Sequence, residues 1–119
     1  MKNITASILA IAILSTVTVQ AAPSVSPTLQ RVIEIRKTLP VPADWHFFMS
    51  NEAEWRDAAR PTHSAYSNLA YKSTFIREWY AMSATDEQLR HTIAHEMGHR
   101  ICNCTDEATA EGIALQILK

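Results

Sequence analysis

The sequence has 119 residues, of which 47% are hydrophobic and 19% are charged, and its formal net charge at pH 7 is −1. This length suits one domain with one modest hydrophobic core. Because the charge is near zero and no basic stripe is present, nucleic acid is not an expected partner.

The first 21 residues have the pattern of a secretory signal peptide, with a positive start at Lys2 and small residues at the cleavage point. The apolar stretch over residues 4–19 is interrupted by Ser and Thr, and a membrane-spanning helix needs roughly 20 apolar residues. We therefore expect residues 1–21 to be removed and residues 22–119 to form one domain. The expected location is secreted or periplasmic, without membrane attachment after cleavage.

The first half of this domain shows alternating helix and strand signals. A Ser-Pro pair at residues 26–27 predicts a helix start, and apolar residues at helical spacing extend the helix to about residue 39. The aromatic and apolar segment 45–49 predicts a buried strand. A cap-like Asn51-x-x-Glu54 then predicts a short helix.

The middle of the chain carries weaker signals. The short helix is expected to end near residue 60, and residues 61–68 are polar enough to predict a loop. Residues 70–80 predict a second strand centred on Thr74-Phe75-Ile76. We expect the three tryptophans to lie in the core; they are Trp45, Trp55 and Trp79.

A capping box at Thr85-x-x-Gln88 opens a predicted helix over residues 86–101. Its apolar stripe has four-residue spacing and consists of Leu89, Ile93, Met97 and Ile101. Beside this stripe lies the H-E-x-x-H pattern of zinc-dependent hydrolases, His95-Glu96-Met97-Gly98-His99. Residues four apart share a helix face, so both imidazoles can reach one ion while Glu96 reaches a water beside it. His91, one turn earlier, is expected to be solvated or to support a ligand.

The two cysteines of the chain, Cys102 and Cys104, follow this helix directly. We favour a local disulfide between them, and free thiols, pairing with another chain and thiolate ligation of zinc are the alternatives. Asn103 between them suits a left-handed turn. Thr105 or Asp106 then caps a last helix that runs to about residue 118.

Zinc at a catalytic site takes three protein ligands, so a third ligand is required. The last helix offers Asp106, Glu107 and Glu111, of which the last two share a face. The segment Glu107-Ala108-Thr109-Ala110-Glu111 resembles the second zinc helix of the gluzincin metallopeptidases, in which Glu-x-x-x-Asp follows the H-E-x-x-H helix. Glu111 stands where that class has Asp, and only seven residues separate His99 from Glu107.

The resemblance covers about residues 63–118 and implies a role for each matching residue. It makes His95, His99 and Glu107 the zinc ligands, Glu96 the general base, and Glu111 the support of a metal-binding imidazole. The metzincin pattern would place its third ligand at position 105, which is Thr, so Asp106 is retained only as an alternative ligand.

The fold implied by the resemblance is a minimal zincin-like α+β domain, with a small mixed sheet packed on helices that include the active-site helix and a C-terminal ligand helix. The strand around residues 74–78 would then form the sheet edge along which an extended peptide lies. The implied activity is that of a secreted zinc metallopeptidase acting on a peptide or protein. Candidate oxyanion donors are His63, Tyr66 and Tyr80. A non-hydrolytic zinc module, an inhibitor or partner protein, and a hydrolase of peptidoglycan peptides are the alternatives, and the oligomeric state is left open.

Overall fold

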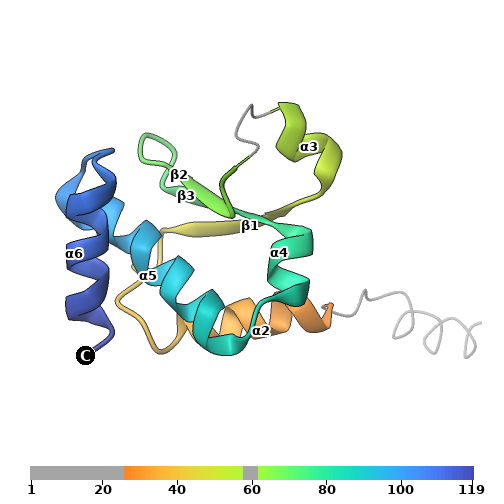
Figure 1. The fold of residues 1–119 in the computed structure, drawn as a ribbon, viewed down its shortest axis with the longest axis horizontal. Coiled ribbons are helices and arrows are strands. Elements are labelled where there is room, and N and C mark those ends of the chain that lie inside the picture. The colour runs from red at the N-terminus through yellow and green to blue at the C-terminus, as the bar shows by residue number, and fades with distance from the viewer. Residues whose placement is uncertain (1–25, 58–61) are drawn as a thin grey trace, which may run out of the picture.

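The computed structural model describes residues 26–57 and 62–119. The expected signal peptide lies outside these residues. In the described part, a three-stranded mixed sheet combines with five helices, which confirms the α+β class (Figure 1). The elements in chain order are α2 (Pro27–Arg36), β1 (His46–Ser50), α3 (Glu52–Asp57), β2 (Ala65–Asn68), β3 (Ser73–Arg77), α4 (Glu78–Ser83), α5 (Asp86–Cys102) and α6 (Glu107–Ile117).

The strands lie in the order β1-β3-β2, with β1 parallel to β3 and β2 antiparallel to it. Two expectations about the sheet are wrong. Residues 65–68, expected in a loop, form β2, because this short polar segment gains its partner only when the chain folds back onto β3. The strand expected at the sheet edge, β3, is central, and the edge strands of the described sheet are β1 and β2.

The strand expected over residues 70–80 is also too long. It ends at Arg77, and the next six residues form the helix α4, which buries Ala81 completely in the core. Trp79 of this helix is 51% exposed rather than buried, because a single short helix presents only one side to the core. Its ring packs under the Arg77 guanidinium, 5.1 Å from ring centroid to Cζ.

Local capping signals define the ends of the other helices. The Ser26 hydroxyl accepts a hydrogen bond from the Leu29 N–H at 3.1 Å, and Thr85 and Gln88 form the reciprocal capping box of α5. Asn103 ends α5 in the left-handed conformation, with φ 50° and ψ 48°. The Asp106 carboxylate caps α6 by accepting from the Thr109 N–H at 2.8 Å. The predicted positions of these three helix starts are confirmed.

The main core lies between one face of the sheet and the helices α2, α4, α5 and α6. Leu89 and Ile93 of α5 and Ile76 of β3 are fully buried there. On the opposite face, aromatic rings stack across the three strands, and Trp55 of α3 packs against Tyr66. Core burial on one side of α5 therefore directs the other side of this helix toward β2 and α6.

None of the helices in residues 26–57 and 62–119 combines the length and the apolar character that a bilayer-spanning segment needs.

Candidate metal centre

The helix α5 holds the two motif histidines rigidly, because its opposite side is anchored in the core. Leu89, Ile93 and Met97 have no exposed surface. His95 and His99 lie one turn apart, with their ring centroids separated by 4.9 Å and their planes nearly perpendicular. The predicted helical spacing thus brings the two imidazoles together on one face.

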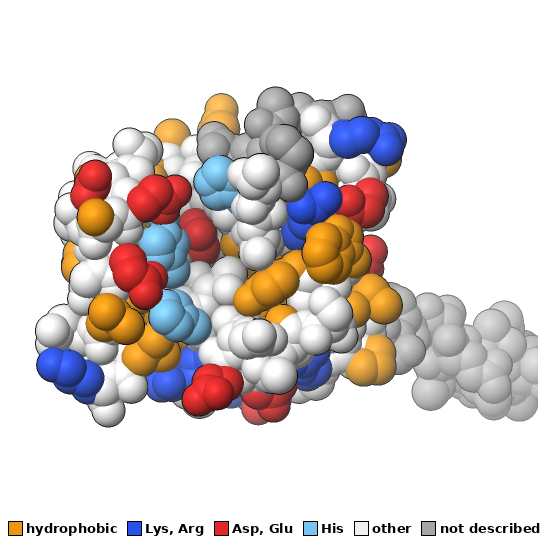
Figure 2. Space-filling model, in the orientation of Figure 1, with side chains coloured by type: hydrophobic (Ala, Val, Ile, Leu, Met, Phe, Trp, Pro, Cys, Tyr) orange, Lys and Arg blue, Asp and Glu red, His pale blue; other side chains and the backbone are white. Residues whose placement is uncertain are grey.

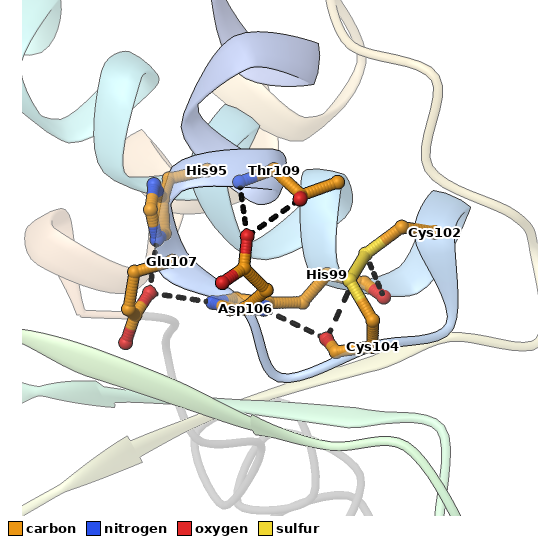
Figure 3. Close-up of a disulfide and its surroundings, with 7 residues drawn as sticks. All are labelled: His95, His99, Cys102, Cys104, Asp106, Glu107 and Thr109. Atoms are coloured by element: carbon orange, nitrogen blue, oxygen red, sulfur yellow. Dashed lines mark hydrogen bonds and ion pairs between the residues drawn. A yellow bond between two sulfur atoms is a disulfide. The ribbon is translucent and has the colours of Figure 1, made fainter.

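The helix α6 supplies the third member of the cluster. Glu107 Oε1 lies 2.7 Å from His95 Nε2 and 2.9 Å from His99 Nε2 (Figure 3). One ligand atom from each of these three residues lies within 4.8 Å of the others, so the group could hold a metal ion. Two imidazole nitrogens and one carboxylate oxygen are donors that divalent transition metals accept.

A glycine permits the close approach of the two helices that carry these ligands. A Cβ placed on Gly98 would lie 2.9 Å from the Cα and the carbonyl carbon of Ala110, and closer still to its carbonyl oxygen. Real side chains do not tolerate such contacts with backbone atoms. The absent side chain at position 98 therefore allows α6 to pack at the distance that brings Glu107 to the two imidazoles.

Hydrogen-bond acceptors fix the orientation of both imidazoles. His95 Nδ1 lies 2.9 Å from Glu111 Oε1, and His99 Nδ1 lies 2.9 Å from the carbonyl oxygen of Cys104. Both oxygens are acceptors only, so each Nδ1 carries the hydrogen of its bond. Each Nε2 is then the atom available to a metal, which is the arrangement typical of histidine ligands.

The turn after α5 holds the acceptor for His99 in place. Cys102 and Cys104 form a disulfide across Asn103 (Figure 3). The Cys104 N–H donates to the His99 carbonyl oxygen at 3.2 Å. The expected local bridge is confirmed. Because both sulfur atoms are in the disulfide, neither thiolate can serve as a metal ligand in this form of the protein.

Glu96 is buried, with 5% of its surface exposed, and lines the same cavity as the two histidines. Its Oε1 accepts a hydrogen bond from the Ser67 hydroxyl at 2.8 Å. Burial raises the pKa of Glu96 above its usual range, while the Ser67 hydrogen bond and the charges of His99 and His95 act in the opposite direction. A cation bound beside this carboxylate would also favour its ionised form.

Charge pairing shifts the pKa values of His95, Glu107 and Glu111. Burial lowers the pKa of His95, but the hydrogen bonds to Glu111 and Glu107 outweigh this effect, and the net shift is upward. The bond from His95 holds the pKa of Glu107 below its usual range, with a further contribution from His99. Hydrogen bonds from His95 and His91 likewise lower the pKa of Glu111. Metal binding at this site must therefore compete with a proton on His95.

A cavity of about 360 Å³ opens over this cluster, between the edge strand β2 and the helices α5 and α6. Figure 2 shows histidine and acidic side chains gathered along this face of the molecule. The histidine and glutamate residues that line the cavity are His63, His91, His95, Glu96, His99, Glu107 and Glu111.

The remaining candidate residues take different places. Asp106 caps α6 and is not part of the three-residue cluster, because its carboxylate is turned to Thr109 (Figure 3). His63 lines the cavity, and its Nε2 lies 3.7 Å from Glu107 Oε2. Tyr66 borders the cavity, but its ring packs against Phe75 and Trp55 on the other face of the sheet, so it does not fit the expected role of oxyanion donor. Tyr80 is not among the cavity-lining residues, and its hydroxyl lies 2.7 Å from Thr92 Oγ1.

Two contacts of the site were not predicted. Ser67 reaches Glu96 from β2, which is 29 residues away in sequence, and no local pattern signals such a contact. His91 Nε2 lies 2.7 Å from Glu111 Oε2, so this carboxylate is shared between two imidazoles. The four-residue spacing of His91 and His95 was the available signal, because both residues face α6 from one side of α5.

Comparison of the chain with models of known protein families, with curated protein sequences and with solved structures found no match.

Proposed function

We propose that this chain is a secreted zinc metallopeptidase of the gluzincin type, with a minimal zincin-like fold. The observation that supports the proposal is the convergence of His95, His99 and Glu107 beside a buried carboxylate, Glu96, in one open cavity. A site that only holds a metal for folding needs no further carboxylate beside its ligands, whereas a hydrolytic site needs one as the general base.

The donor set favours zinc over other common cations. Calcium and magnesium prefer oxygen ligands alone, whereas two imidazoles with one carboxylate are a catalytic zinc set. Three protein ligands leave a coordination position for water or substrate. The Nδ1 partners of both imidazoles, Glu111 and the Cys104 carbonyl, are the supporting groups that such a site requires.

Zinc, when bound, would lower the pKa of water and polarise the scissile carbonyl. Glu96 would then accept the proton that the attacking water loses and deliver it to the departing amine nitrogen. Because Ser67 occupies Oε1 of this carboxylate, Oε2 is the oxygen free to take the proton. His63, which lines the cavity, is the candidate to stabilise the negative charge on the carbonyl oxygen.

The substrate would be an extended peptide. The strand β2 pairs with β3 on one side only in the described sheet, and Ala65, Tyr66 and Ser67 line the cavity. A peptide can add to such an edge through main-chain hydrogen bonds. This mode of binding suits both protein substrates and the peptide cross-links of peptidoglycan.

The alternative of a closed, non-hydrolytic zinc module has less support. Such a site fills all four coordination positions with protein groups, and the soft ligands nearest to the cluster would be Cys102 and Cys104. Their disulfide removes both from the set of ligands. The described cluster of three residues fits an open site better.

Activity of the Glu96→Gln variant tests the proposal. Zinc-loaded protein is expected to cleave casein or a mixed peptide library, and Glu96→Gln is expected to lose at least about 100-fold in kcat while keeping its zinc. Glu87→Gln is the matched control, because Glu87 lies exposed in the first turn of the same helix. Equal cleavage by wild type and Glu96→Gln would refute the assigned base, and the absence of cleavage by the wild type would refute the peptidase assignment.

A further inference from the structure

A buried line of hydrogen bonds crosses the sheet and ends on Glu96. The Trp45 Nε1–H donates to Thr74 Oγ1 at 2.9 Å, and Thr74 Oγ1 lies 2.9 Å from Ser67 Oγ. Ser67 Oγ in turn donates to Glu96 Oε1 at 2.8 Å. Trp45 is 3% exposed and Thr74 is fully buried, so two of the three donors are shielded from water.

The chemistry of the end groups fixes the direction of this line. An indole N–H can only donate, and an ionised carboxylate can only accept. Ser67 must therefore use its single hydrogen on Glu96, which makes it the acceptor for Thr74. Thr74 then uses its own hydrogen on Ser67 and accepts from Trp45, so all three hydrogens point toward the carboxylate.

The sheet determines where these groups lie. Ser67 of β2 and Thr74 of β3 are register partners in the antiparallel ladder, and Trp45 directly precedes β1. The line thus runs from the segment before one edge strand, through the central strand, to the other edge strand. Hydroxyl groups at both central positions are needed for it, because Ala or Val there would interrupt the line.

We propose that Ser67, Thr74 and Trp45 are positioning residues for Glu96. The line fixes Glu96 Oε1 on Ser67 and so presents Oε2 to the space beside His95 and His99. Successive hydrogen bonds of one direction polarise one another, which strengthens the last bond of the line. The catalytic consequence of this inference rests on the proposed function, but the line of hydrogen bonds can be tested without measuring peptide cleavage.

Kinetic measurements on paired variants test the catalytic consequence. Ser67→Ala removes a hydrogen bond to a charged group, and we expect kcat to fall about 10- to 100-fold with zinc content unchanged and KM within about threefold. Thr74→Val replaces the second hydroxyl with a methyl group in a side chain of similar shape and is expected to lower kcat about 3- to 10-fold. Thr74→Ser, which keeps the hydroxyl, is expected to restore most of this loss.

Ser73→Ala is the matched control for the kinetic series. Ser73 is buried beside Thr74 in β3, but its hydroxyl donates to the Tyr71 carbonyl and lies outside the line. The Ser73→Ala variant is therefore expected to keep the kcat of the wild type. If wild type is active and Glu96→Gln is not, unchanged kcat in Ser67→Ala would overturn the positioning role and leave the proposed function standing.

The indole N–H resonance of Trp45 provides a second test that needs no substrate. Glu96→Gln is expected to shift this resonance in the wild-type background and to shift it much less in the Thr74→Val background, because the line is then interrupted. Trp45→Phe assigns the signal, and the exposed Trp79 serves as the reference. Equal shifts in both backgrounds, or none in either, would overturn the proposal even if no peptide were cleaved.

Discussion

A methyl group added at Gly98 should separate the two ligand helices. In an open helix, Gly→Ala stabilises by about 1 kcal/mol through helix propensity. At position 98 the new Cβ would meet the backbone of Ala110, which can yield only if α6 moves as a unit. Overpacking costs about 1–3 kcal/mol, and a backbone contact places this case at the upper end. The expected net result is a loss of about 2 kcal/mol in the free energy of unfolding.

Gly112→Ala is the matched control. Gly112 lies exposed on α6, and an added Cβ would meet nothing within 4 Å, so the full gain of about 1 kcal/mol is expected. For a domain of this size, 1 kcal/mol corresponds to about 4–8 °C in Tm. Two substitutions of the same chemical kind should therefore move the stability in opposite directions.

Thermal unfolding followed by circular dichroism in excess chelator measures both effects without a contribution from bound metal. We expect Tm to fall by about 8–16 °C in Gly98→Ala and to rise by about 4–8 °C in Gly112→Ala. With zinc present, Gly98→Ala should also gain less in Tm than the wild type, because α6 carries a ligand. A Tm of Gly98→Ala equal to or above that of the wild type would refute the close-packing argument.

Three further predictions concern the cluster and its supports. Because the pKa of His95 is raised in the metal-free protein, Tm in chelator should fall as pH rises from about 6.5 through that raised pKa. Zinc affinity, measured by chelator competition, should increase over the same pH interval. Slopes of the opposite sign would contradict the pairing of His95 with Glu107 and Glu111. Glu111→Gln should weaken zinc binding by about 10- to 100-fold without changing the stoichiometry, and unchanged affinity would exclude Glu111 as the support of His95. Reduction of the Cys102–Cys104 disulfide, or its replacement by two serines, should make the Cys104 carbonyl oxygen, which accepts from His99 Nδ1, less well positioned, and so lower zinc affinity in the same assay. Unchanged zinc affinity would show that the turn positions this carbonyl without the disulfide.

The sequence predicts the starts of α2, α5 and α6 and the cluster of His95, His99 and Glu107 well, because the helix caps and the spacing of the two histidines are local. Capping at Thr85 and Asp106 requires only residues three positions away, and both caps are present. His95 and His99 share a face because the helix repeat places them there. The pairing of Cys102 with Cys104 is equally local, since one residue separates them.

The missed features depend on contacts between distant segments. The strand β2 is too short and polar to be recognised alone, and it exists because its four residues pair with β3. The helix α4 contains Trp79 and Tyr80, residue types that favour strands, but burial of Ala81 against the core decides its conformation. Ile101, expected in the apolar stripe of α5, is 46% exposed because the last turn of that helix carries it away from the core.

The zinc content of three proteins after dialysis, measured by mass spectrometry, tests the assigned metal ligands directly. Wild type should retain one zinc per chain, Glu107→Ala should lose it, and Asp106→Asn, which keeps the α6 cap, should bind it like the wild type. Zinc retained by Glu107→Ala at wild-type affinity, or lost from Asp106→Asn in a folded protein, would contradict the assignment of His95, His99 and Glu107 as the metal site.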